Sequence, residues 1–225
     1  MIEIIENTIQ LVLTGICAWL ALYRAVRSKE HAWALLGLFS CIFFLGDLYW
    51  LLFLVFYKKT PQYYSVSDLS WYTSYLFLLL MLIYIRVEIC GQRMPGMRQC
   101  GGPAGWVRQF PPLLWCVPVF TAGMCVFYMQ RGDYLSNIVA AALMTGLIWH
   151  ALSGLISLRG QPEQQGRLRM LFFITILFCL TEYALWTSSC FWMGDTIANV
   201  YYWFDLLLSV TFVLFLPALR KAVDG

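Results

Sequence analysis

Charged residues are scarce in this chain of 225 residues: Asp, Glu, Lys and Arg together make up only 12% of it. A soluble domain carries about 25%. Hydrophobic residues make up 61% and occur in long blocks, each close to the ~20 residues that a bilayer span needs. The shortage of charge therefore excludes an ordinary soluble domain and predicts a polytopic membrane protein.

Metal-binding and hydrolytic patterns are also missing. The two histidines, His31 and His150, lie far apart in the sequence, and the eight cysteines show no metal-ligand spacing. This excludes a multi-histidine zinc site. No G-x-S-x-G, H-E-x-x-H or Cys–His pair occurs, so nucleophilic and metal-assisted hydrolysis have no candidate residues. We expect no metal and assign no catalytic residue, although an intramembrane enzyme that uses carboxylates alone stays open.

Seven segments are apolar enough to cross a bilayer, and they take up most of the chain. They predict an all-α fold: a single domain, 1–225, that forms a seven-transmembrane-helix bundle with short loops. The first segment is preceded by Glu3 and Glu6 rather than by basic residues, which argues against a cleavable signal peptide. The spans are expected at about 5–23, 32–57, 66–90, 112–130, 134–158, 168–192 and 196–219.

The basic residues predict the orientation of the bundle. If the N-terminus lies outside and the C-terminus in the cytoplasm, twelve of the 15 Lys and Arg residues fall on cytoplasmic segments, which is the positive-inside pattern. Only Lys58, Lys59 and Arg131 fall outside. We therefore expect a multi-pass protein of a bacterial cytoplasmic (inner) membrane. Its basic flanks would contact anionic lipid headgroups, and no nucleic acid is expected as a partner.

Three acidic residues lie near the middle of predicted spans: Asp47, Glu182 and Asp205. No Lys or Arg shares those helices at that depth, and an ionisable group there costs roughly 2.5–3.5 kcal/mol. A helical rise of about 1.5 Å per residue places all three about 15 Å below the outer surface. This shared level predicts one site. The alternative is that neutral carboxyls simply hydrogen-bond neighbouring helices.

Aromatic and hydroxyl residues share helix faces with these acids, at spacings of three or four residues, and in the third predicted span Asp68, Trp71 and Tyr75 share a face. Aromatic rings beside carboxylates suit organic ammonium groups through cation–π attraction, although aromatic belts are also normal at membrane interfaces. The pattern predicts an outward-facing pocket for a small cationic or amphipathic ligand. The candidate ligand-binding residues are Asp47, Trp50, Asp68, Trp71, Tyr75, Glu182, Trp186, Tyr202, Asp205 and Ser209.

Three functions compete for this predicted pocket. A receptor-like sensor is favoured because no catalytic set is present. A cation- or proton-coupled transporter is the alternative, with His150 as a candidate proton relay, and an intramembrane enzyme is the third. The segments 91–112 and 157–169, rich in Gly and Arg, are expected to be cytoplasmic loops that either dock a cytoplasmic partner or act as flexible linkers.

Short motifs carry a resemblance to microbial rhodopsins. Y-W-F-D-L-L-L-S-V (202–210) is similar to their seventh helix, with Asp205 at the aspartate that precedes the retinal lysine by four residues, and Y-A-L-W (183–186) resembles part of their aromatic cage. The lysine position is Ser209, and no predicted span contains a lysine. A retinal Schiff base is therefore excluded, and no cofactor is expected.

A second similarity is internal. L-G-D-L-Y-W (45–50) is similar to L-T-E-Y-A-L-W (180–186), which predicts two parallel helix triplets around a fourth, spacer span unless the similarity is chance. The layout resembles the PQ-loop sugar transporters, but Pro61 and Gln62 fall in a predicted loop. The chain also resembles the seven-span sensory modules that are fused to some histidine kinases, and that resemblance implies an output through a separate partner.

Overall fold

The computed structural model describes residues 2–61, 65–89, 134–158, 162–189 and 194–223, which form helices and turns without any strand. The predicted all-α fold is thus confirmed for this part of the chain. The helices are α1 (Ile2–Ser28), α2 (His31–Tyr57), α3 (Val66–Tyr84), which continues into the π-helical turn η1 (Ile85–Ile89), α7 (Tyr134–Ser157), α8 (Pro162–Ser189) and α9 (Val200–Val223).

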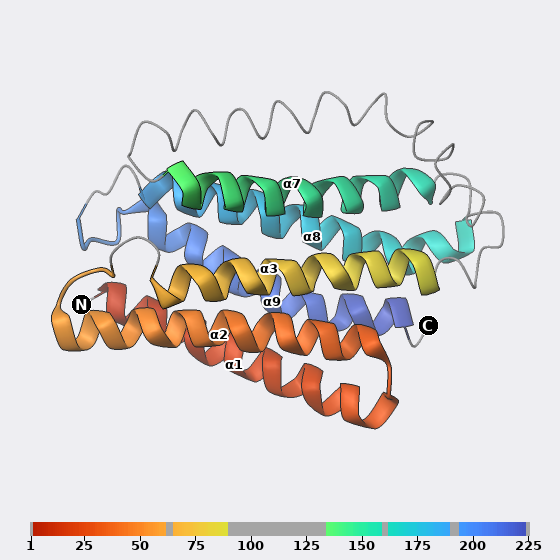
Figure 1. Ribbon diagram of the computed structural model, residues 1–225, viewed down its shortest axis with the longest axis horizontal. Coiled ribbons are helices and arrows are strands. Elements are labelled where there is room, and N and C mark those ends of the chain that lie inside the picture. The colour runs from red at the N-terminus through yellow and green to blue at the C-terminus, as the bar shows by residue number, and fades with distance from the viewer. Residues whose placement is uncertain (1, 62–64, 90–133, 159–161, 190–193, 224–225) are drawn as a thin grey trace.

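The six long helices form a closed bundle (Figure 1). Each packs against the next in the order α1, α2, α3, α7, α8, α9, and α9 packs back against α1. Helices α1, α3, α7 and α9 run in one direction, and α2 and α8 run in the other. The first three and the last three described helices therefore have the same up-down-up order, as two parallel triplets would.

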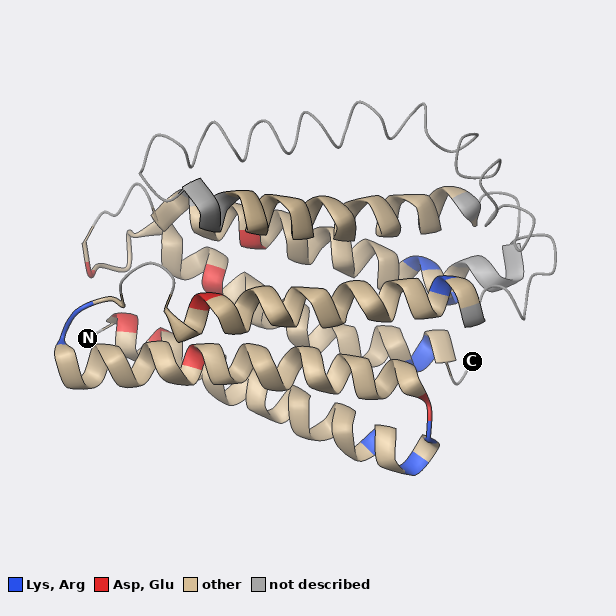
Figure 2. Cartoon of the chain, viewed as in Figure 1, with Lys and Arg blue, Asp and Glu red and all other residues tan. Residues whose placement is uncertain are grey.

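All six of these helices are long and apolar enough to cross a membrane. Their outward faces are apolar as well: on α1 alone, Ile5, Val12, Ile16, Trp19 and Val26 are exposed. A soluble protein rarely exposes so much contiguous apolar surface. Figure 2 shows most acidic residues in the half of the bundle that holds the start of α1 and most basic residues at the opposite end. The described helices are those of a multi-pass membrane protein; which membrane it occupies and which end faces outside stay predictions.

Several predicted boundaries need correction. Helix α1 begins at Ile2, so Glu6 lies within the first helix rather than before it. Helix α8 begins at Pro162 rather than near residue 168, so the predicted loop 157–169 is wrong from residue 162 onward. The fourth predicted span, 112–130, and the loop 91–112 lie outside the described residues. The predicted count of seven spans therefore stays a prediction.

Local sequence explains how the helices end. Lys58 has the left-handed backbone conformation, with φ 55°, and its N–H donates to the carbonyl of Leu54 at 3.0 Å, which caps α2. Helix α3 begins with a capping box, in which Ser65 and Asp68 satisfy each other's backbone N–H groups. These caps fix where α2 ends and where α3 begins, and the candidate site uses this antiparallel pair of helices.

Candidate functional site: a buried layer of carboxyl groups

The structure brings the three predicted acids together inside the bundle. Asp47 on α2, Glu182 on α8 and Asp205 on α9 are 3%, 4% and 2% exposed. Asp47 lies within electrostatic range of both other carboxyls. In the described part of the chain, no Lys or Arg is among the charged neighbours of these three acids. The donors that lie at hydrogen-bond distance from these acids are indole, phenol and amide groups.

Helix α3 supplies the donor to Asp47. The indole Nε1 of Trp71 donates to Asp47 Oδ1 at 3.0 Å. Gly46 permits this approach, since a Cβ added there would lie 2.9 Å from that same Nε1. The ring of Trp50 packs on Trp71 with centroids 5.6 Å apart. Of the three tryptophans in the predicted ligand-binding set, Trp50 and Trp71 thus lie near Asp47, and Trp71 donates to it.

Glu182 is held by two donors. The hydroxyl of Tyr75 on α3 donates to Glu182 Oε1, and the indole Nε1 of Trp186, one turn along α8, donates to the same oxygen at 3.1 Å. Tyr75 is completely buried. The ring of Tyr72 lies 6.4 Å from that of Trp186, so aromatic side chains from two helices lie around this acid.

Asp205 is bound by residues of α1 that the sequence interpretation missed. The side-chain amide of Gln10 donates to Asp205 Oδ1 at 2.6 Å, and the carboxyl of Glu6, one turn earlier on α1, is within electrostatic range of Asp205. Thr14, one turn further along α1, lies beside Asp47. Glu6, Gln10 and Thr14 follow each other at intervals of four residues and are all buried. That spacing was the available signal, and placing Glu6 outside the span hid it.

Four carboxyl groups from four helices therefore make up the site. We call Glu6, Asp47, Glu182 and Asp205 the carboxyl layer. Three of its buried oxygens have no hydrogen-bond donor: Glu6 Oε1, Asp47 Oδ2 and Glu182 Oε2. Buried polar atoms in proteins are nearly always paired. No group of three or more His, Cys, Asp or Glu side chains within the described ranges could hold a metal ion, so the layer as it stands does not have the geometry of a metal centre.

Other predicted ligand residues have different roles. Asp68 accepts from the N–H of Ser65 at 2.9 Å and serves the cap of α3. The Tyr202 hydroxyl donates to Asp195, at 2.8 Å, in the turn before α9. Ser209 donates to the backbone carbonyl of Asp205 at 3.1 Å. These hydrogen bonds go to groups other than the carboxyls of the three buried acids, and a ligand-binding role for the three residues stays a prediction.

His150, the candidate proton relay, lies on α7, a helix that contributes no member of the carboxyl layer. The charged group that acts on it is Arg86 near the start of η1. Among the described residues, α7 packs against α3 and α8. A proton-relay role for His150 stays a prediction.

A cluster of aromatic rings packs beside the layer on the side of the basic end. Phe212 stacks on Phe39 with centroids 4.9 Å apart and packs on Phe43 at 4.7 Å. Phe178 and Phe215 complete this phenylalanine cluster, and all five side chains are at most 2% exposed. The interior next to the acids on that side is therefore densely apolar.

Helical spacing places the phenylalanine cluster relative to the acids. Phe43 precedes Asp47 by four residues on α2, and Phe178 precedes Glu182 by four residues on α8. Because α2 and α8 run toward the acidic end, each phenylalanine lies about 6 Å, or one turn, nearer the basic end than its acid.

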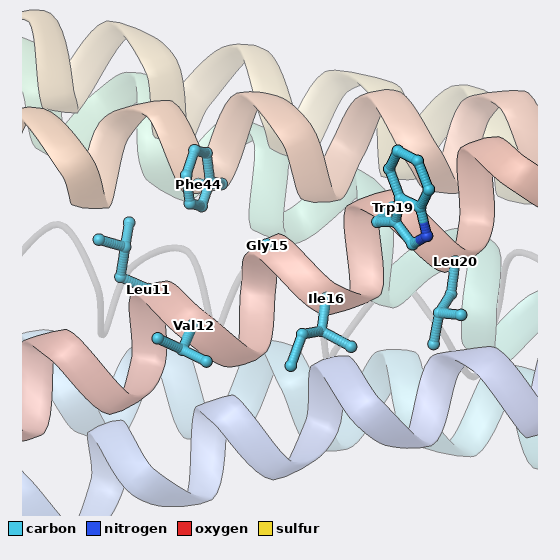
Figure 3. Close-up of a pocket in the computed structure, with 7 residues that line it drawn as sticks. All are labelled: Leu11, Val12, Gly15, Ile16, Trp19, Leu20 and Phe44. Atoms are coloured by element: carbon cyan, nitrogen blue, oxygen red, sulfur yellow. The ribbon is translucent and has the colours of Figure 1, made fainter.

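A groove of about 430 Å³ lies elsewhere, on the outer face of α1 (Figure 3). It is lined by Leu11, Val12, Gly15, Ile16, Trp19, Leu20 and Phe44. Figure 3 shows these side chains along α1 and on the facing turn of α2, with no polar group among them apart from the indole of Trp19. This groove is suited to lipid chains and does not open onto the carboxyl layer. An outward-facing pocket at the acids stays a prediction.

Comparison of the chain with protein-family models, with characterised proteins and with solved structures finds no match. The resemblances to rhodopsins, PQ-loop transporters and sensory modules therefore stay predictions.

Proposed function

We propose that this multi-pass membrane protein binds a small cationic ligand at the carboxyl layer and acts as a receptor-like sensor. The observation that supports this most directly is the pair of buried oxygens without donors, Asp47 Oδ2 and Glu182 Oε2. A buried acceptor left unpaired costs about 1–3 kcal/mol. An ammonium group would supply the missing N–H donors, and the aromatic faces of Trp71 and Trp186 beside it would add cation–π attraction.

The phenylalanine cluster favours sensing over passage of the ligand. Five buried rings fill the space next to the acids on the side of the basic end. The phenylalanine cluster would block a ligand that enters from the acidic half. The ligand would not pass through the bundle. Its binding would change the contacts among α1, α2, α8 and α9, because each of these helices contributes one carboxyl. A cytoplasmic partner would then bind the two arrangements of these helices with different affinity.

The proposal is tested with alkylammonium compounds as probes, from methylammonium to tetrabutylammonium, on the purified protein in lipid nanodiscs. We expect at least one probe to bind, and expect Asp47→Asn and Glu182→Gln each to weaken it tenfold or more, which corresponds to about 1.4 kcal/mol. Glu30→Gln is the matched control, because Glu30 precedes α2 at the opposite end and its side chain makes no cap hydrogen bond. Equal affinity in all four proteins would refute the site.

A cation- or proton-coupled transporter is the second candidate, and one observation favours it. The hydrogen bonds Gln10–Asp205 and Tyr75–Glu182 each join the triplet α1–α3 to the triplet α7–α9. Transporters built from helix repeats hold their substrate and coupling ions at such an interface. In proteoliposomes, probe-driven proton flux that depends on Asp47 and Glu182 would support transport. Binding without any flux would leave the sensor.

A further inference from the structure

We infer that the groove on the outer face of α1 holds one acyl chain of an anionic phospholipid, whose phosphate is bound at the basic end of the same helix. The site is separate from the carboxyl layer, and the inference does not depend on the cationic ligand proposed above. It rests on two features of α1. An apolar groove runs between Leu11 and Leu20, and a basic segment with Arg24, Arg27 and Lys29 follows it directly.

The groove has the length of an acyl chain in one leaflet. It runs along α1 from Leu11 to Leu20 (Figure 3), which is about 14 Å by helical rise. Half of the hydrocarbon core of a bilayer measures about 15 Å. Gly15 lines the groove where Phe44 of α2 comes closest, since a Cβ added at Gly15 would lie 3.1 Å from Phe44 Cε2. A chain that lies in the groove would therefore contact both helices.

Arg27 lies on the same face of α1 as the groove. It follows Leu20 by seven residues and Ile16 by eleven, and both spacings return to nearly the same direction at 3.6 residues per turn. Tyr23 is exposed between the groove and Arg27, and the guanidinium carbon of Arg27 lies 4.8 Å from the centroid of the Tyr23 ring. Because side chains on a helix point back toward its N-terminus, both of these side chains lean toward the groove.

The end of α1 carries an excess of positive charge. Residues 24–30 include three basic side chains and one acidic side chain, Glu30. Arg27 and Lys29 are exposed, and the guanidinium carbon of Arg24 lies 5.3 Å from the centroid of a tryptophan ring on α2. Arginine binds phosphate oxygens through paired N–H donors. Basic residues beside a membrane also attract anionic headgroups, so this segment suits a lipid phosphate.

The headgroup, rather than the chain, decides which lipid binds. Bilayer chains are as apolar as the groove, so a chain gains little by moving into it. A headgroup with net negative charge is attracted to Arg27 and Lys29, whereas a zwitterionic headgroup brings its own positive charge to the same place. A second copy of the chain packed in parallel would bring an identical basic segment. An anionic phospholipid such as phosphatidylglycerol is therefore the occupant that the charges favour.

Native mass spectrometry of the protein released from nanodiscs tests the inference. The nanodiscs contain equal amounts of phosphatidylglycerol and phosphatidylcholine with identical chains. We expect the parent protein to retain one phosphatidylglycerol with a preference of about fivefold or more, the effect of one basic side chain near an anionic surface. Arg27→Gln/Lys29→Gln should bring the preference close to equality. Arg167→Gln/Arg169→Gln is the matched control, because both arginines are exposed near the start of α8, at the same end of the bundle.

A substitution in the groove tests the chain separately from the headgroup. Ile16 lines the groove and is 50% exposed, so Ile16→Trp would fill the groove from its open side. We expect this variant to lose the retained phosphatidylglycerol. Leu180→Trp is the control, because Leu180 on α8 is also 50% exposed and does not line the groove.

Each outcome decides for or against the lipid site. Equal retention of the two lipids by the parent protein, or a preference that survives Arg27→Gln/Lys29→Gln, overturns the binding of the phosphate. Retention by Ile16→Trp equal to that by Leu180→Trp overturns the binding of the chain in the groove. A dimer that Ile16→Trp dissociates would mean that a second copy of the protein fills the groove, and it would overturn the lipid site as well.

Discussion

The indole of Trp71 on α3 donates to the carboxyl of Asp47 on α2 at 3.0 Å, and Gly46 is the residue that lets the two helices approach closely enough. A Cβ at position 46 would lie 2.9 Å from Trp71 Nε1 and 3.1 Å from the Cβ of Ser70. The bond between the predicted acid and its predicted aromatic neighbour thus depends on a residue with no side chain.

Gly46→Ala should therefore displace Trp71 from Asp47. We expect a loss of about 1–3 kcal/mol in the free energy of unfolding, typical of overpacking, together with a shift in tryptophan fluorescence. Gly146→Ala is the control, because its added Cβ would only meet the side chain of Leu79 at 3.4 Å and alanine favours a helix. Unfolding in mixed micelles, followed by tryptophan fluorescence, gives the free energy of unfolding of both variants. Similar stabilities for the two variants would contradict the close α2–α3 contact.

Tyr75→Phe should destabilise the bundle modestly. The substitution removes the hydroxyl that donates to Glu182 from α3 and leaves only Trp186 on the acid. Hydrogen bonds between helices in membranes contribute about 0.6 kcal/mol on average and up to about 1.7 kcal/mol, so we expect a loss in that range. Tyr57→Phe, at a side chain that is 66% exposed, should change nothing. If Tyr57→Phe costs as much, the phenol–carboxyl bond has no special role.

Phe212→Ala should open a cavity in the phenylalanine cluster. Phe212 contacts Phe39, Phe43 and Phe178 and is 1% exposed. We expect a loss on the order of 3 kcal/mol, as for buried Phe→Ala changes elsewhere. Phe173→Ala on α8 provides the comparison, since Phe173 is 61% exposed and lipid replaces its contacts. The unfolding midpoint of each variant is measured in nanodiscs. Equal midpoints for Phe212→Ala and Phe173→Ala would mean that the phenylalanine cluster is not tightly packed.

Asp68→Ala should affect stability but not ligand binding. Asp68 belongs to the capping box of α3 with Ser65, and loss of a cap costs about 1 kcal/mol. The affinity for an alkylammonium probe should stay within twofold of the parent, whereas Asp47→Asn should lower it strongly. Titration of both variants with the same probe checks this. A tenfold loss with Asp68→Ala would return Asp68 to the ligand-binding set.

Much of the carboxyl layer was predictable because depth in a helix can be counted. Asp47, Glu182 and Asp205 share a level by helical rise alone, and Trp186 was placed beside Glu182 by its spacing of four residues. Trp71 and Tyr75 were predicted from the face that they share with Asp68 on their own helix. Which donor meets which acid was not predictable. Tyr75 reaches across from α3 to Glu182 of α8, and spacing within one helix carries no information about its neighbours.

The missed residues have an equally physical explanation. Glu6 precedes the most hydrophobic part of α1, so it was interpreted as a flanking charge, and its burial follows only from the position of α9 beside it. The Asp68 cap, in contrast, had a sequence signal: Ser65 followed three residues later by an acid at the start of a helix. Its interpretation as a ligand residue overlooked this local role.

By itself the sequence determined that the chain forms long apolar helices, and it determined the depth of each acid along its helix, because hydropathy and helical rise are properties of single segments. Only the tertiary structure decided that α1 and α9 are neighbours, that Gln10 therefore meets Asp205, and that Trp71 and Tyr75 divide between two acids. These relations depend on how helices pack around a common axis, and packing is settled by contacts between segments far apart in the chain.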